Sequence, residues 1–463
     1  MGDFIVAAKG GVTSIPPGKW ALTLKRFSAE HEATWALIPL YGIDNKLAMA
    51  RVVVQLLNQT VGVNGKQRSP CLGLDVEAEA LLAARILLRE REGAEALMDD
   101  KALELFVHAA KEEGDAACGY RVSLMALKCI NNAIWDQPSG QLVFVRLGGM
   151  DMLVTLMQVC RPGSVLYFAS RIFNVVGTSN SRSFAKVKME HDLLQPLLTV
   201  LVWCVRCTDP PFPEGEDRLK LMVQVLQGIF LLGARLTTEE KNKALTGDKR
   251  KWLGYLLVDI LHLDHQHLDT FMAKLQALNL LLDMPSSFAE VLIAHGCLPR
   301  ILQVIELQLV RQDYREGGDI DAAAELTPAL LVLNKLVLAS EESRTAVKAA
   351  IFPPEADEVW REQLAREQEE VMCLSGDGRR QVDKASTTKD TTGRRVHPVD
   401  APRGSLRARL FKQMTATEGS SKAAVSDLIF NLCEDEEEFT IRCGFGNAIN
   451  TLRLKGKISM AGM

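Results

Sequence analysis

Residues 122–135, VSLMALKCINNAIW, indicate what kind of fold this chain adopts. On a helix of 3.6 residues per turn, this segment is apolar on most of its sides. The apolar positions are Val122, Met125, Leu127, Ile130, Ala133 and Ile134. Lys128 and Asn132 are one turn apart and share a strip of the surface. Such a helix is predicted to pack between neighbours and to leave one polar strip open.

The residues after this helix extend the pattern. Residues 136–157, DQPSGQLVFVRLGGMDMLVTLM, predict a turn, a short helix, a second turn at Gly148 and Gly149, and another apolar helix. This order is typical of the junction between two armadillo repeats.

Apolar helices that carry a polar residue recur along the chain. Their segments are 81–90, 124–135, 166–180, 222–234, 274–287 and 326–340. The aligned polar residues recur every 42 to 55 residues or so, which suits armadillo or HEAT units with variable loops. They are Asn132, Asn174, Gln227, Asn279 and Asn334. The sequence therefore predicts an all-α fold, a right-handed α-solenoid of the armadillo/HEAT type, with an unrelated helical bundle as the alternative.

Changes in composition suggest four regions. Residues 1–40 are rich in Gly and Pro at first and predict a weakly structured N-terminal cap. Residues 41–353 hold the repeats, and residues 354–404 predict a charged helix followed by a mobile loop without apolar periodicity. Residues 405–463 predict one more repeat of the same solenoid. The basic bias of the loop fits a solvated linker, with a contact for an acidic partner as the alternative.

The composition excludes several classes of protein. The chain has 463 residues, of which 47% are hydrophobic and 24% charged, and its net charge is −4. These values suit a globular protein and carry no signature of nucleic-acid or membrane binding. The ten cysteines are scattered, several of them in apolar helices, which favours buried free thiols. Without a signal-peptide pattern or an apolar run long enough to span a bilayer, we expect a cytoplasmic monomer.

Motifs for catalysis or cofactor binding are weak. The segment GVNGK at 62–66 lacks the spacing of a phosphate-binding loop, and Cys204 and Cys207 form a single CxxC in an apolar helix. His262, His265 and His267 are better explained as a polar surface than as metal ligands, because they do not share one helix face. We therefore expect no metal, no cofactor and no catalytic chemistry, and a function that lies in a binding surface.

That surface is predicted to be a concave groove. A superhelix of repeats lines its groove with the last helix of each repeat, so the polar strips of these helices should lie there. The candidate partner-binding residues are Arg85, Arg89, Lys128, Asn132, Arg171 and Asn174. Arginines and asparagines in this arrangement suit a peptide, because Asn pairs with backbone groups and Arg forks onto a carboxylate.

Several segments resemble one family. ARILLRER at 84–91, LKCINN at 127–132, SRIFNVVGT at 170–178 and AVSDLIFNLCEDEEEFTIRCGFGNA at 424–448 resemble the synembryn family. These proteins are armadillo-like chaperones and guanine-nucleotide exchange factors for the α subunits of heterotrimeric G proteins. The resemblance runs over about residues 70–460, and its C-terminal motif is the most specific part. That motif includes Asn431, Gly444, Gly446 and Asn447.

The resemblance implies a mechanism. Such proteins grip the C-terminal helix of GDP-bound Gα in their groove, draw it from the nucleotide-binding core, and hold the nucleotide-free state until GTP enters. By motif, Arg85 and Arg89 would receive the Gα terminal carboxylate. Asn132 and Arg171 match residues of the next two inner helices. Recruitment to the inner face of the plasma membrane would then follow from the partner.

This sequence departs from the family pattern in places. The family usually continues into an acidic, phosphorylatable segment and a further helix, whereas this sequence ends at Met463. Position 174 is Asn where an apolar residue is more usual. The alternatives are an armadillo-type peptide adaptor similar to an importin, since Trp135 follows Asn132 by one turn, and a co-chaperone that exchanges nucleotide on a heat-shock ATPase.

Overall fold

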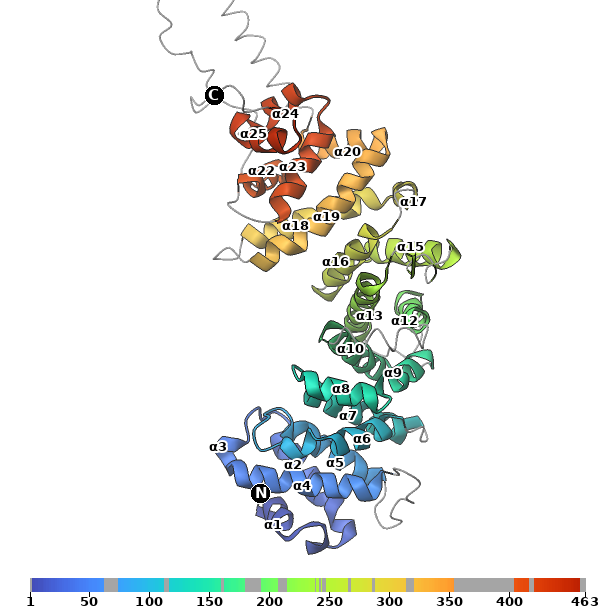
Figure 1. Ribbon diagram of the computed structural model, residues 1–463, viewed down its shortest axis with the longest axis vertical. Coiled ribbons are helices and arrows are strands. Elements are labelled where there is room, and N and C mark those ends of the chain that lie inside the picture. The colour runs from blue at the N-terminus through green and yellow to red at the C-terminus, as the bar shows by residue number, and fades with distance from the viewer. Residues whose placement is uncertain are drawn as a thin grey trace, which may run out of the picture. The chain divides into compact units, whose positions relative to one another are not determined.

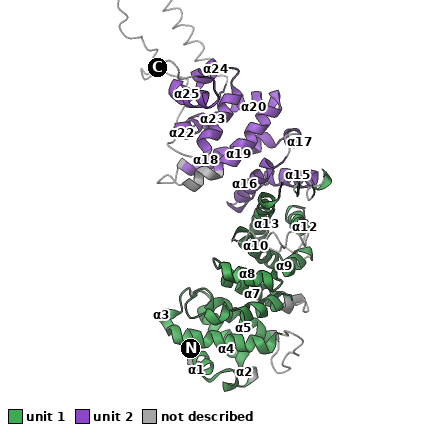
Figure 2. Cartoon of the chain, in the orientation of Figure 1, with its two compact units in different colours: residues 1–249 green, residues 250–463 purple. Residues whose placement is uncertain are grey.

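The described part of the chain consists of helices and turns. A computed structural model describes residues 2–61, 74–111, 116–159, 162–179, 193–206, 215–237, 239–240, 243, 247–264, 268–284, 288–313, 320–353, 404–415 and 420–458 (Figure 1). These residues include no β-strand, so the predicted all-α fold is confirmed. The chain forms two compact units, residues 1–249 and 250–463 (Figure 2).

Unit 1 is built from helix pairs. Its helices are α1 (Gly2–Gly10), α2 (Pro17–His31), α3 (Ile38–Tyr41), α4 (Ile43–Thr60), α5 (Leu74–Leu87), α6 (Asp100–Ala110), α7 (Ala116–Ile134), α8 (Pro138–Arg146), α9 (Gly149–Gln158), α10 (Gly163–Ser179), α12 (Leu194–Arg206) and α13 (Gly215–Arg235), with 3₁₀ turns η1 (Val12–Ser14) and η2 (Glu95–Leu97). Helices α5, α7, α10 and α13 pack on one another in chain order (Figure 1). Each also packs against a partner, namely α4, α6, α9 and α12 in the same order.

The segment 122–135 forms the second of these stacked helices, α7. Leu127 and Ile130 are fully buried, whereas Lys128 and Asn132 are half-buried, as the apolar faces and the polar strip predict. The predicted Gly148–Gly149 turn joins α8 to α9. Gly148 has a φ of 72°, a left-handed conformation that glycine adopts without strain.

The region predicted as a weakly structured N-terminal cap, residues 1–40, contains helices in its described part. Helices α1 and α2 occupy residues 2–10 and 17–31, and α2 packs on α5. Trp20, Leu24 and Phe27 recur at helical spacing and are almost fully buried. The apolar stripe of α2 therefore outweighs the Gly and Pro residues around it.

Unit 2 is also built from packed helices. Its helices are α15 (Gly247–Leu261), which spans the boundary between the units, α16 (Leu268–Leu282), α17 (Phe288–Ala294), α18 (Cys297–Asp313), α19 (Ile320–Ala339), α20 (Glu341–Ile351), α22 (Leu406–Thr415), α23 (Ser420–Leu432), α24 (Glu436–Cys443) and α25 (Phe445–Leu454). Helix α19 is central, because α16, α18, α20 and α23 all pack against it. The final segment thus joins the unit directly, and the predicted charged helix and loop at 354–404 lie outside the described residues except for Gly404.

The cysteines and the apolar helices of the described residues can be compared with the sequence predictions. Cys129, Cys204, Cys297, Cys433 and Cys443 are buried, and none of these five forms a disulfide. Among the described helices, none alone has the length and apolar character to cross a bilayer, and two bent pairs, α8 with α9 and α17 with α18, meet that test only when combined.

Candidate partner-binding groove

A groove of about 410 Å³ lies where α5, α7 and α10 follow one another in unit 1. We call it the α5–α7 groove. Its lining residues are Trp35, Arg85, Leu88, Arg89, Arg91, Lys128, Asn132, Trp135 and Phe168. Four of them are cations and three are aromatic, and none is a carboxylate. In a chain with a net charge of −4, this is a local positive site with apolar walls.

The two arginines of the first strip are held by a segment that we call the strap, residues 31–38. Arg85 forms an ion pair with Glu32. Arg89 Nη1 donates hydrogen bonds to the carbonyl oxygens of His31, at 3.1 Å, and Thr34, at 2.8 Å. The strap therefore lies directly beside the cations of the groove.

The same strap is fixed to the end of α5 by Glu90. Its Oε2 accepts hydrogen bonds from the backbone N–H groups of Leu37 and Ile38, at 2.9 and 3.1 Å. Buried Lys46 donates from Nζ to the carbonyl oxygens of Glu90 and Glu92, at 2.5 and 2.6 Å. Burial raises the pKa of the Glu90 carboxyl, but these N–H donors and Lys46 outweigh it and hold that pKa below its usual value. The carboxylate is thus ionised and ties the strap to α5.

Helix α7 supplies the second strip of the groove. Lys128 Nζ lies 5.4 Å from the centroid of the Phe168 ring, in cation–π range. Asn132 Nδ2 donates to the carbonyl oxygen of Arg85 at 3.5 Å, and Asn132 Oδ1 accepts from Asn131 Nδ2 at 3.2 Å. Trp135, which is 47% exposed, forms a wall at the end of this helix.

The two candidates on α10 do not line the groove. The guanidinium of Arg171 lies 5.1 Å from the centroid of the Trp135 ring and donates to Tyr167 Oη at 3.1 Å, so it contacts a residue that lines the groove. Asn174 was expected in the open strip but is buried, and its Nδ2 donates to the Gln224 carbonyl oxygen at 2.9 Å. It joins α10 to α13, where Gly228 allows a close approach.

The glycines and asparagines of the C-terminal motif have local structural roles. Asn431 Nδ2 donates to Asn334 Oδ1 at 2.8 Å, which links α23 to α19. Gly444 has a φ of 77° and ends α24, and Asn447 Nδ2 donates to the carbonyl oxygen of Cys443 at 3.0 Å. Gly446 has open space around it.

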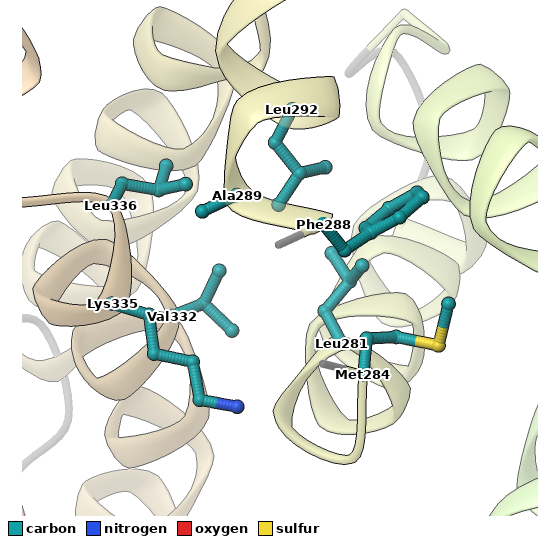
Figure 3. A pocket seen from close by; sticks show the side chains of 8 residues that line it. All are labelled: Leu281, Met284, Phe288, Ala289, Leu292, Val332, Lys335 and Leu336. Atoms are coloured by element: carbon teal, nitrogen blue, oxygen red, sulfur yellow. The ribbon is translucent and has the colours of Figure 1, made fainter. Parts of the chain in front are cut away.

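A second hollow in unit 2 is much smaller, at about 10 Å³ (Figure 3). Figure 3 shows Lys335 among apolar side chains of α16, α17 and α19, and its Nζ donates to the carbonyl oxygen of Leu282 at the end of α16. The volume suits about one water molecule and no metabolite. Within the described residues, no group of three or more His, Cys, Asp or Glu side chains could hold a metal ion, and His265 and His267 lie outside them.

Comparison with known proteins identifies the family. A family model described as guanine nucleotide exchange factor synembryn matches residues 80–368, which is well over half of the chain. The chain belongs to the synembryn family. Synembryns are guanine nucleotide exchange factors, which act by binding, and the family implies a G-protein α subunit as the partner. No curated protein matches the chain.

The matched range covers most of the groove but not the whole site. All lining residues except Trp35 lie within 80–368, whereas the C-terminal motif lies beyond it. Sequence reasoning missed Leu88, Arg91, Phe168 and Trp35 as lining residues, and it named Trp135 only for the importin-like alternative. Arg91 belongs to the quoted ARILLRER segment and could have been found there. Trp35 could not, because it comes from the N-terminal region and reaches the groove only through the strap.

Proposed function

We propose that this exchange factor grips the C-terminal helix of a Gα subunit in the α5–α7 groove, stabilises the nucleotide-free state and also acts as a folding chaperone for Gα. The observation that supports this most is the cluster of four cations between aromatic walls. A helix C-terminus carries a negative partial charge and a terminal carboxylate, and both are stabilised by such a cluster.

The size of the groove fits the end of a helix. A helix about 10 Å wide that rises 1.5 Å per residue occupies roughly 120 Å³ per residue. A volume of about 410 Å³ therefore takes the last three or four residues, with the apolar side chains against Trp135 and Phe168. We expect the preceding turns of the Gα helix to lie along the polar strip of α7.

Exchange then needs no proton transfer or covalent step. A partner that binds only the opened state of Gα shifts the population of Gα toward that state by its differential affinity. GDP dissociates from the opened state, and the empty Gα stays bound until GTP enters. We place this activity in the cytoplasm, where the protein acts as a monomer and reaches the membrane through Gα.

The test is GDP release from purified Gα. The wild-type protein should accelerate release and form a stable nucleotide-free complex, and the double variant Arg85→Ala/Lys128→Ala should do neither well. Arg146→Ala is the matched control, because Arg146 is an exposed cation of unit 1 that pairs with Asp100 on α6. No acceleration with any Gα class, or equal loss in the control, would refute the proposal.

Co-expression tests the chaperone activity separately. Soluble Gα should accumulate with the wild-type protein and less so with the double variant. The adaptor alternative predicts capture of a basic localisation peptide instead. Arg85, Arg89, Arg91 and Lys128 disfavour such a peptide by like-charge repulsion, so strong capture would support the adaptor.

A further inference from the structure

Arg85 is already paired with a carboxylate of its own chain. Glu32 forms the ion pair with Arg85, and the same Oε1 lies 4.0 Å from Arg89 Nη2. The Glu32 side chain is 56% exposed, whereas those of Arg85 and Arg89 are 14% and 15% exposed. One carboxylate oxygen thus lies near two guanidinium groups, and its side chain is more than half exposed.

The two arginines differ in how many hydrogen bonds their guanidinium groups make. Arg89 is committed to two backbone carbonyl oxygens of the strap. Arg85 keeps a buried Nε without a hydrogen-bond partner among the described residues. A guanidinium can take a carboxylate through two parallel hydrogen bonds, so Arg85 has capacity that Glu32 does not fill.

We propose that Glu32 is an internal stand-in for the terminal carboxylate of the partner, and that the partner binds by displacing Glu32 from Arg85. This inference rests on the proposed function and deepens it. In this proposal Arg85 makes the exchangeable contact, and Arg89 positions the strap. Only a partner that ends in a carboxylate can compete with Glu32 for Arg85.

The free energy needed to break the Glu32–Arg85 ion pair is small. An ion pair with one exposed partner contributes little, so a well-placed incoming carboxylate can replace it. Removing the competitor should tighten binding of a free carboxylate by about two- to fivefold. A partner whose terminus is amidated cannot replace Glu32 and should gain nothing.

Titration calorimetry on the full chain tests this with two peptides. Both have the C-terminal sequence of a Gα subunit, one with a free carboxylate and one with a terminal amide. Glu32→Gln keeps the shape of the side chain and removes its charge. Glu30→Gln, which removes an exposed carboxylate from the last turn of α2, two residues before Glu32, is the control for long-range repulsion. Circular dichroism verifies that each variant is folded.

The expected result is a two- to fivefold gain in affinity for the free-acid peptide with Glu32→Gln, and unchanged affinity for the amide peptide and with Glu30→Gln. Equal or weaker binding of the free acid by Glu32→Gln overturns the inference, as does an equal gain for the amide or with Glu30→Gln. If wild type accelerates GDP release but binds neither peptide, the inference fails while the exchange activity stands. If wild type does neither, both fail.

Discussion

Arg85 and Arg89 lie one turn apart, yet they predict different effects when removed. Arg89 holds two strap carbonyl groups, and hydrogen bonds from a charged donor contribute about 1.5–3 kcal/mol. Arg89→Ala should therefore lower the free energy of unfolding by about 1–3 kcal/mol. Arg85→Ala should lower it by less than about 1 kcal/mol, because its partner Glu32 is exposed.

Binding should show the opposite order. Arg85→Ala should weaken the free-acid Gα peptide by roughly tenfold or more, since a terminal charge then lacks its main partner. Urea unfolding and calorimetry on the same preparations measure both effects. If Arg85→Ala destabilises the protein as much as Arg89→Ala does, the division of roles is wrong.

Glu438 predicts how stability depends on pH. Burial raises the pKa of Glu438, but hydrogen bonds from the Glu434 N–H, Arg442 and Lys348 outweigh burial and leave that pKa below its usual value. A depressed folded-state pKa stabilises the protein above the unfolded pKa, near 4.3, and this contribution is lost as pH falls through the folded pKa.

Glu438→Gln should therefore be less stable than wild type at pH 7 and approach wild-type stability below about pH 4. Urea unfolding at several pH values measures this, with Glu437→Gln, an exposed neighbour on α24, as the control. A constant difference between wild type and Glu438→Gln across this range would contradict the assignment.

Asn174 shows where single residues escape prediction from sequence. The 3.6-residue period places it near Arg171, but period alone does not tell how closely the next helix approaches. Gly228 lets α13 come so near that a Cβ there would lie 3.0 Å from Asn174 Oδ1. The exposure of Asn174 thus depends on a residue of a different repeat, and the repeat pattern carries no such information.

At the scale of elements, the repeated helices were predictable and the strap was not. Apolar periodicity fixes which side of α7 is buried, and Lys128 and Asn132 follow from it. The stripe of Trp20, Leu24 and Phe27 on α2 was present in the sequence but masked by nearby Gly and Pro. The strap has no apolar periodicity that would predict its structure. Its order depends on Arg89 and Glu90, which lie more than 50 residues later in the sequence.

The α8–α9 corner gives a prediction about an element junction. A Cβ at Gly149 would lie 2.3 Å from the ring of Phe144, which is fully buried. Gly149→Ala should therefore lower the free energy of unfolding by about 1–3 kcal/mol through overpacking. Gly446→Ala should change it by less than about 0.5 kcal/mol, because nothing lies within 4 Å of the added methyl group.

Thermal and urea unfolding of the two glycine variants measure this difference. Equal losses would mean that Gly446 is needed for packing, which the open space around it does not explain. A loss of Gα binding by Gly446→Ala at unchanged stability would instead place the C-terminal motif in the interface.

At the scale of the whole molecule, each unit has a core of its own. A protein with two cores often unfolds in more than one step. Hydrogen exchange in rising urea should show α5, α7 and α10 losing protection at a different concentration from α19 and α23. Gly149→Ala should move only the first group, whereas simultaneous loss in all helices would show a single cooperative unit.

The packing of α23 against α19 has a consequence for engineering. Asn431 meets Asn334, and Lys348 meets Glu438, although residues 354–403 separate these helices in the sequence. The contacts themselves hold the last repeat in place, and doubling the length of a connecting segment costs only about 0.6 kcal/mol of closure entropy. A guest domain such as a fluorescent reporter should therefore be tolerated between Pro353 and Gly404, because unit 2 is held together by contacts on either side of that point.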